Sequence, residues 1–243
     1  GLKAGDKRLL ARVITLLENG AVPALKEPVL KAAAELDVPV LGITGTGGAG
    51  KSSLTDEIVR RFRLDQGDTV KIGLISIDPS RKRTGGALLG DRIRMNAIEH
   101  PSIFMRSLAT RDTGSEISAA LPEVIAACKL TGFDLVIVEN VGNLICPAAF
   151  NLGTHANVLI ASVPEGDDKP YKYPGIYRGL QALILNKTDL LPYVPFNLDY
   201  FRKGVEVLNP GLAFFPLSCR TEEGLNAWTD WIKRRVLEHQ GRA

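Results

Sequence analysis

Eight residues in the first quarter of the chain have the spacing of a phosphate-binding loop. Residues 45–52 read Gly-Thr-Gly-Gly-Ala-Gly-Lys-Ser and match the pattern Gly-x-x-x-x-Gly-Lys-Ser/Thr. The glycines let the backbone curl so that successive N–H groups point at a polyphosphate. We expect Lys51 to reach the β- and γ-phosphates and the Ser52 hydroxyl to ligate Mg²⁺. The predicted nucleotide-binding residues here are Gly45, Gly47, Gly48, Ala49, Gly50, Lys51, Ser52 and Ser53.

Two acidic residues follow apolar runs that are typical of buried strands. Asp78 comes after the run 70–77, and Glu139 comes after the run 133–138. Carboxylates at the carboxyl ends of parallel strands lie where open α/β sheets bind ligands. We expect Asp78 to hold Mg²⁺ directly or through water, although an N-cap for a following helix is the alternative. Glu139 is expected to accept from a Mg²⁺-bound water, and the Gly142 N–H to bond a γ-phosphate oxygen.

A third motif has the residue types that recognise guanine. The sequence Asn-Lys-Thr-Asp at 186–189 follows another apolar run. Guanine presents N1–H and N2–H₂ as neighbouring donors, which the Asp189 carboxylate can accept together, whereas adenine has no such pair. We expect Asn186 to bridge base and loop, the Lys187 stem to lie over the base, and backbone N–H groups at Ser218 and Cys219 to meet guanine O6. The alternative is a turn that only begins a helix.

These motifs need a sheet and helices to position them. Apolar runs predict strands at 38–43, 70–77, 103–105, 133–138, 158–163, 182–185 and 213–217. Helical spacing predicts helices at 6–18, 29–36, 54–62, 117–130 and 224–237. The alternation predicts a three-layer α/β fold of the P-loop NTPase type, with a mostly parallel sheet and helices on both faces. We divide the chain into a helical extension at 1–36 and a nucleotide-binding domain at 37–243.

The composition narrows the class of protein. The chain has 243 residues, and 30 basic against 27 acidic side chains give a net charge of +3, too balanced to favour nucleic acid as a partner. No apolar run approaches the roughly 18 residues of a membrane span, so we expect no membrane partner. Three scattered cysteines, Cys128, Cys146 and Cys219, are too few for a disulfide framework and favour a reducing, cytoplasmic setting.

The first part of the chain resembles the G domain of the adenosylcobalamin-dependent acyl-CoA mutase chaperones (MeaB-type), including the version fused into isobutyryl-CoA mutase. The resemblance extends over about 5–138, and the segments 42–54, 77–80 and 85–95 carry it. From about 139 to 235 the chain instead resembles the hydrogenase-maturation nickel-insertion GTPase (HypB-type). The segments 139–148, 165–170 and 186–193 carry this second resemblance. A junction at the third buried strand predicts a hybrid of the two, natural or engineered.

Both resemblances imply a Mg²⁺-dependent GTPase that binds GTP and GDP and dimerises in a nucleotide-dependent way. The implied partner is a client metalloenzyme or a cobalamin-dependent mutase, and Lys169 is implied to reach the nucleotide or the dimer partner. The nickel-insertion family binds metal through an adjacent Cys-His pair and the cysteine that matches Cys146. The corresponding loop, 108–116, has neither Cys nor His. Cys146 is therefore either an orphan ligand for Ni²⁺ or Zn²⁺ or a small buried residue.

The predicted reaction is in-line attack of water on the γ-phosphate of GTP. Lys51 and the loop amides stabilise the developing charge, while Asp78 and Asp91 are the candidates for positioning the water. We expect unassisted turnover on the order of 10⁻³ to 10⁻⁴ s⁻¹, as in unstimulated switch GTPases. Two alternatives stay open at this point: a P-loop kinase for a small molecule, and a module that binds nucleotide or metal with little hydrolysis.

Overall fold

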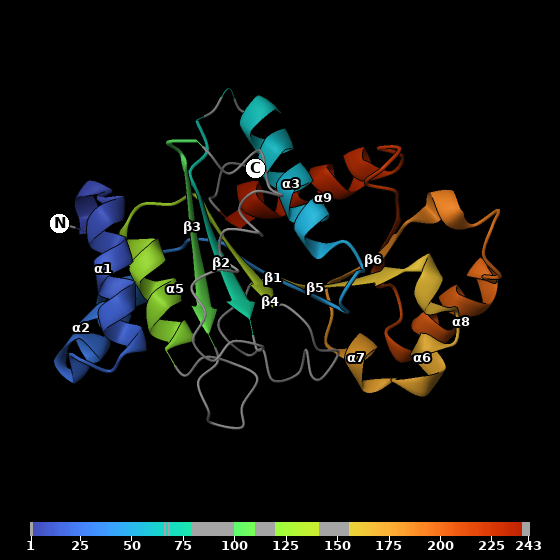
Figure 1. The fold of residues 1–243 in the computed structure, drawn as a ribbon, viewed down its shortest axis with the longest axis horizontal. Helices are drawn as coiled ribbons and strands as arrows, with labels where there is room; N and C mark the ends of the chain where they lie inside the picture. The colour runs from blue at the N-terminus through green and yellow to red at the C-terminus, as the bar shows by residue number, and fades with distance from the viewer. Residues whose placement is uncertain are drawn as a thin grey trace.

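The computed structural model describes residues 2–65, 67, 69–78, 100–109, 120–140 and 156–239. In this part of the chain one parallel sheet of seven strands has the order β3-β2-β4-β1-β5-β6-β7 (Figure 1). The strands are β1 (Val40–Gly45), β2 (Ile72–Asp78), β3 (Ile103–Ala109), β4 (Leu135–Asn140), β5 (Ala156–Ser162), β6 (Ala182–Asn186) and β7 (Ala213–Pro216). All seven predicted strands are present, and the α/β fold class is confirmed.

Two helices cover one face of the sheet. They are α3 (Lys51–Asp65), which follows the phosphate-loop sequence, and α9 (Leu225–His239). Leu54 and Ile58 of α3 and Trp228 of α9 belong to one buried apolar cluster with Ile43 of β1 and Ile137 of β4. The helical spacing of apolar residues that predicted both helices therefore marks the faces that they bury.

The opposite face is covered near β2, β3 and β4 by α1 (Lys7–Glu18), α2 (Lys26–Ala34) and α5 (Leu121–Leu130). Asp6 caps α1, since its side chain accepts from the N–H groups of Arg8 and Leu9. Leu10 and Ile14 of α1 share a buried cluster with residues of α5, β2 and β4. The N-terminal helices thus bury their apolar stripe against the same core as the sheet, while the division at residue 36 stays a prediction.

The rest of that face, over β5, β6 and β7, carries α6 (Lys169–Lys172), α7 (Gly175–Arg178) and α8 (Leu198–Leu208). Phe201 and Val205 of α8 lie in a third apolar cluster with Leu183 of β6. None of these three helices was predicted from the sequence. Short 3-10 helices complete the elements: η1 (Leu2–Ala4), η2 (Pro23–Leu25), η5 (Val163–Glu165) and η6 (Thr188–Leu190).

The strand order brings several sequence motifs to one edge of the sheet. Because all strands are parallel, the carboxyl ends of β1, β4, β5 and β6 meet there, and β1 lies between β4 and β5. In this arrangement the chain leaves β1 at a point where the strand order reverses, which is where open α/β sheets bind ligands.

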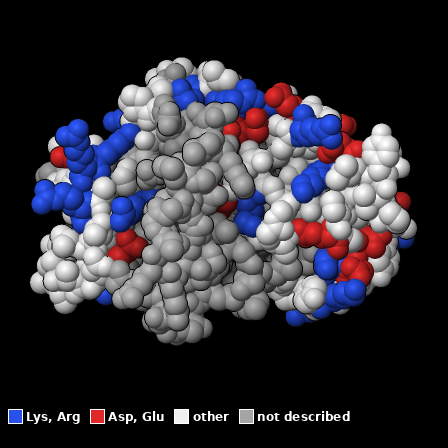
Figure 2. Space-filling view, viewed as in Figure 1, with Lys and Arg blue, Asp and Glu red and all other residues white. Residues whose placement is uncertain are grey.

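The surface carries both signs of charge. On the face shown in Figure 2, Lys and Arg are frequent on the side of α1 and α2, and acidic and basic side chains intermingle on the side of α6 and α8. None of the described helices combines the length and the apolar composition that a bilayer crossing requires.

Candidate nucleotide-binding site

The loop between β1 and α3 has the backbone that its glycines predict. Gly48 and Gly50 take positive φ values of 80° and 99°, a region that side chains rarely adopt. Gly45, still in β1, lies so close to β5 that a Cβ there would be 2.5 Å from the Ile160 carbonyl oxygen. The chain therefore curls between β1 and α3, and the N-terminus of α3 faces the concavity, as an anion-binding loop requires.

Lys51 is held at the centre of this loop. Its ammonium donates to the carbonyl oxygens of Gly45 and Thr46, each at 2.7 Å, and the residue is 6% exposed. Burial lowers the pKa of Lys51 from the ordinary value of 10.5, and the nearby Glu139 and Glu165 carboxylates oppose that shift. An ammonium has three protons, so two are used by the loop and one remains for a phosphate oxygen.

The end of β4 supplies an oxygen ligand beside Ser52. Glu139 is 2% exposed, and its Oε1 accepts from the Ser52 hydroxyl at 3.1 Å. Thr55 on the next turn of α3 contacts the other carboxylate oxygen at 3.4 Å. Adjacent ligands of an octahedral Mg²⁺ lie about 3 Å apart, and both groups are the hard oxygen donors that Mg²⁺ prefers. The positions of Ser52 and Glu139 therefore fit a magnesium ion, and their predicted roles in holding it stay predictions.

Asn186, at the end of β6, ties the phosphate loop to the predicted base-binding motif. Its Nδ2 donates to the Ala49 carbonyl at 2.9 Å, and its Oδ1 accepts from the N–H groups of Lys187 at 2.7 Å and Cys219 at 3.3 Å. A Cβ on Gly50 would lie 2.2 Å from this Nδ2. Lys187, at φ 63°, extends its ammonium to the Gly48 carbonyl at 2.6 Å. The phosphate loop and the segment 186–189, which are distant in sequence, are therefore in direct contact.

A hollow of about 430 Å³ lies beside this junction. This volume is within the range of small-molecule sites. The residues that line it come from the phosphate loop, the β6 end and the segment after β7: Gly50, Ser53, Asn186, Lys187, Asp189, Leu190, Ser218, Cys219 and Arg220. The Ser218 hydroxyl donates to Asp189 Oδ1 at 2.7 Å, which fixes the orientation of the carboxylate. The hollow has the position and the acceptor that guanine recognition needs.

One detail of the predicted base site is corrected. The backbone N–H of Ser218 donates to the Glu223 carbonyl at 2.9 Å, so it does not face the hollow as a free donor. The Ser218 hydroxyl oxygen also accepts from the N–H groups of Arg220 and Thr221, both at 3.2 Å. These bonds close the turn that begins at Ser218. Cys219 lines the hollow, but its backbone N–H already donates to Asn186 Oδ1 at 3.3 Å. Burial raises the pKa of its thiol to about 11, so the thiol is neutral there.

Several predicted residues lie elsewhere or outside the described part of the chain. Asp91, Gly142 and Cys146 lie in ranges that the structure does not describe, as does the side chain of Asp78, whose backbone ends β2. Their predicted roles stay predictions. Among the described residues no cluster of three or more His, Cys, Asp or Glu side chains has the arrangement of a metal site.

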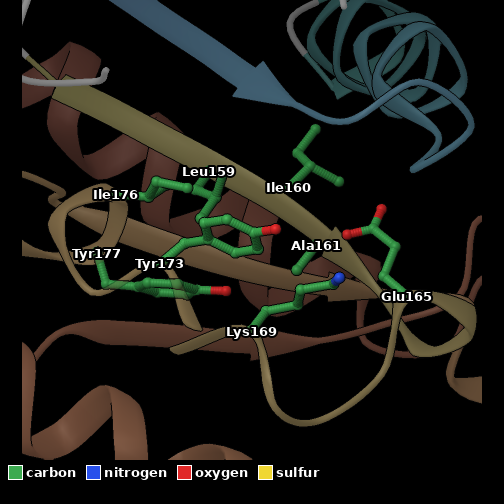
Figure 3. Close-up of a pocket in the computed structure, with 8 residues that line it drawn as sticks. All are labelled: Leu159, Ile160, Ala161, Glu165, Lys169, Tyr173, Ile176 and Tyr177. Atoms are coloured by element: carbon green, nitrogen blue, oxygen red, sulfur yellow. The ribbon is translucent and has the colours of Figure 1, made fainter. Parts of the chain in front are cut away.

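Lys169 lies apart from the base hollow. It lines a second, much smaller hollow with Glu165, Tyr173 and Tyr177, and its ammonium is 5.6 Å from the centre of the Tyr173 ring (Figure 3). Glu165 itself contacts the phosphate loop, because its carboxylate accepts from the Thr46 hydroxyl. We predicted no specific role for Thr46 or Glu165 from the sequence. The sequence did contain one indication of such a role, because Glu165 is an acidic residue just after the apolar run of β5, the strand that pairs with β1.

The fold and the loop between β1 and α3 define a P-loop nucleotide-binding protein. Comparison with known proteins then identifies the family: residues 10–197 match the family described as methylmalonyl Co-A mutase-associated GTPase MeaB. The chain belongs to this family. The matched range includes residues on both sides of the junction predicted after residue 138, and the hybrid stays a prediction.

Individual relatives agree with both resemblances. The chain is 71% identical over 140 residues to the fused isobutyryl-CoA mutase of Cupriavidus metallidurans, covering 57% of this chain and 13% of that protein. It is 30% identical over 195 residues to the hydrogenase maturation factor HypB of Escherichia coli, covering 80% of this chain and 62% of that protein. The crystal structure of HypB from Archaeoglobus fulgidus superposes with a TM-score of 0.66 at 26% identity, over 89% of this chain and 99% of that one.

Proposed function

We propose that this chain binds Mg²⁺–GTP, hydrolyses it slowly, and acts as a GTP-dependent chaperone that loads the cofactor of a cobalamin-dependent acyl-CoA mutase. Membership of the MeaB family supports this proposal, as does the identity with a fused isobutyryl-CoA mutase. The observation that carries the nucleotide assignment is the hollow in which Asp189 is oriented by Ser218 beside the phosphate loop. A kinase for a small molecule has no need of that carboxylate.

In the proposed mechanism the chain positions and stabilises charge and forms no covalent intermediate. Lys51 and the loop amides hold the β- and γ-phosphates, and Ser52 and Glu139 would hold Mg²⁺, which neutralises phosphate charge when bound. Asp189 accepts from the guanine N1–H and N2–H₂ donors. Asp78 and Asp91 are the proposed groups for orienting the attacking water, and the Gly142 N–H is the proposed sensor of the γ-phosphate.

Nucleotide competition tests the base assignment. Wild type is expected to bind GTP more tightly than ATP, and Asp189→Ala to lose that preference because the two guanine donors lose their acceptor. Asp199→Ala is the matched control, since this exposed carboxylate on α8 lies outside the hollow. An unchanged guanine preference in Asp189→Ala would defeat the assignment.

Phosphate release tests the enzyme assignment. With Mg²⁺ present we expect turnover on the order of 10⁻³ to 10⁻⁴ s⁻¹, and with the metal chelated a further loss. A turnover tens of fold faster with no partner present counts against a switch. No measurable hydrolysis by a protein that binds GTP favours the alternative of a nucleotide-binding module.

The relatives support a proposal on the client and on the assembly. We propose a cobalamin-dependent mutase as client, and a homodimer that forms in the GTP state, with Lys169 reaching the partner or the nucleotide. Pull-down with protein locked by a non-hydrolysable GTP analogue tests the client, and sedimentation in GDP against the analogue tests the dimer.

A second candidate, nickel insertion into a hydrogenase, is favoured by the HypB relatives. Ni²⁺ and Zn²⁺ titration of wild type against Cys146→Ala tests it, and equal weak binding by both proteins counts against it.

A further inference from the structure

Glu165 lies against the phosphate loop but has no part in the proposed chemistry. It ends η5, the short helix that directly follows β5. The register of the sheet places Gly45 opposite Ile160 of β5, and the close approach at Gly45 presses the start of the loop against that strand. Glu165 therefore reaches the first residues of the loop from the neighbouring strand.

The Glu165 carboxylate is fixed between two hydroxyls. Its Oε1 accepts from the Thr46 hydroxyl, in the loop, and from the Ser162 hydroxyl at 3.2 Å, at the end of β5. Ser162 is 3% exposed, so the β5 side of this arrangement is buried. Figure 3 shows the Glu165 side chain turned toward the loop that follows β1, away from Tyr177. This contact joins the loop to the η5–α6 segment.

Thr46 connects Glu165 to Lys51. While its hydroxyl is bound to Glu165, its carbonyl oxygen accepts from the Lys51 ammonium at 2.7 Å. Fixing the side chain of Thr46 limits the rotation of its peptide, and the Thr46 carbonyl is one of the two that accept from the Lys51 ammonium. The negative charge of Glu165 also favours the protonated form of Lys51 against the effect of burial.

We propose that Glu165 is a positioning residue for the β- and γ-phosphates: through Thr46 it orients the ammonium of Lys51. This inference rests on the proposed function, because it concerns the same nucleotide site. The competing explanation is that Glu165 only closes the turn after β5 through Ser162. The two explanations differ in what Thr46 does and in which part of the nucleotide is affected.

Four variants test the proposal: Glu165→Ala, Glu165→Gln, Thr46→Val and the double variant Glu165→Ala/Thr46→Val. Affinities for a non-hydrolysable GTP analogue and for GMP are measured by competition with a fluorescent GDP. Glu165→Ala and Thr46→Val are expected to weaken the GTP analogue about 10-fold, the size of one charge-assisted hydrogen bond. GMP affinity is expected to stay unchanged, since Lys51 reaches only the β- and γ-phosphates.

The other variants separate positioning from charge and from folding. Glu165→Gln keeps an acceptor for both hydroxyls and is expected to bind the GTP analogue within about 3-fold of wild type. The double variant is expected to bind the GTP analogue no more weakly than Glu165→Ala does, because both single changes break the same Glu165–Thr46 hydrogen bond. Asp168→Ala, which removes a carboxylate from the same segment, pairs with Lys172 and is the control for a general charge effect.

Each failure has its own signature. If wild type binds neither GTP nor GDP, the proposed function fails. If wild type binds them and Thr46→Val keeps full affinity for the GTP analogue, the proposal is overturned. Equal losses for GMP and the GTP analogue in Glu165→Ala also overturn it, since they indicate a general structural defect. If Glu165→Ala does not fold, the comparison of Thr46→Val with Thr46→Ser decides, and equal affinities overturn the proposal.

Discussion

At the scale of single residues, the site depends on a few side chains that serve two partners each. Asn186 is 2% exposed and bonds both to the phosphate loop at Ala49 and to the base segment at Cys219. Because position 50 is a glycine, the side-chain amide of Asn186 can occupy the space where a Cβ would otherwise lie. A buried amide that is bonded on both sides fixes the spacing between the phosphate loop and the proposed base site.

The chemistry of Asp189 gives a prediction on specificity. In Asp189→Asn the carboxylate becomes an amide that can donate, so it no longer accepts both guanine donors. Xanthine replaces the guanine 2-amino group by a carbonyl acceptor, and we expect the variant to prefer XTP over GTP. Competition of the two nucleotides against a fluorescent GDP or XDP measures the ratio. A retained preference for GTP would contradict the role of Asp189 in reading the base.

Lys51 gives a prediction on pH. Because burial lowers its pKa, the folded, nucleotide-free protein binds fewer protons at this residue than the unfolded chain. Its unfavourable contribution to stability is therefore present at neutral pH and disappears as the pH rises toward the ordinary lysine value of 10.5. The free energy of unfolding of wild type, minus that of Lys51→Met, is expected to rise over this range. Urea titrations at several pH values measure it, and a falling difference would contradict the burial effect.

At the scale of elements, the position of α8 is determined by an N-terminal cap and one buried apolar stripe. The Asn197 side chain accepts from the Tyr200 N–H at 2.9 Å, and Phe201 and Val205 pack against β6 and its neighbours. The first turn of α8 contacts α6 through the stacked rings of Tyr200 and Tyr171, whose centres are 4.3 Å apart. The helix thereby supports the segment that carries Lys169.

The cap of α8 can be tested alone. Asn197→Ala is expected to lower the free energy of unfolding by about 1 kcal/mol, since one N–H of the first turn loses its acceptor. The backbone N–H of Asn197 keeps its bond to Asp167 in the variant, so the loss reports the side chain. Asn197→Asp keeps an acceptor and is expected to stay close to wild type. Urea denaturation checks both, and equal stability of wild type and the alanine variant would refute the cap.

At the scale of the whole molecule, the N-terminal helices and the sheet share one core. Leu10 and Ile14 of α1 are fully buried and cluster with Ile75 and Val136 of the sheet. A helix that buries its apolar stripe in this way unfolds with the sheet, because separation would expose both surfaces. The proposed division at residue 36 would then describe the sequence but not a unit that unfolds independently.

Substitutions in α1 test this cooperativity. Leu10→Ala is expected to cost about 2–5 kcal/mol and to shift the single unfolding transition of the entire chain. Leu16→Ala, on the outer side of the same helix at 37% exposure, is the control and should change stability by at most about 0.5 kcal/mol. Far-UV circular dichroism and the fluorescence of the two tryptophans, Trp228 and Trp231, should report the same midpoint. Two separate transitions would show that α1 is an independent appendage.

The sequence by itself determined the phosphate loop, the seven strands and the guanine-type motif. These are local properties: loop 45–52 needs its glycines and Lys51, and each buried parallel strand needs a short apolar run. The role of Asp189 in reading the base stays a prediction. The expected Ser218 N–H donor is instead bonded to the Glu223 carbonyl, because that contact depends on how the turn closes. Likewise α8 was missed, although Asn197, Phe201 and Val205 carry a cap and a helical stripe.

Only the tertiary structure decided which distant side chains meet. Glu165 and Thr46 are 119 positions apart, and Asn186 and Ala49 are 137 apart. Each pair comes together because the parallel order places β5 beside β1 and β6 beside β5, with their carboxyl ends on one edge. Strand order results from packing over the whole sheet, so no local pattern of residues contains it. The predicted phosphate-binding loop is therefore specified by eight consecutive residues, while the contacts of Thr46 with Glu165 and of Ala49 with Asn186 form only in the folded chain.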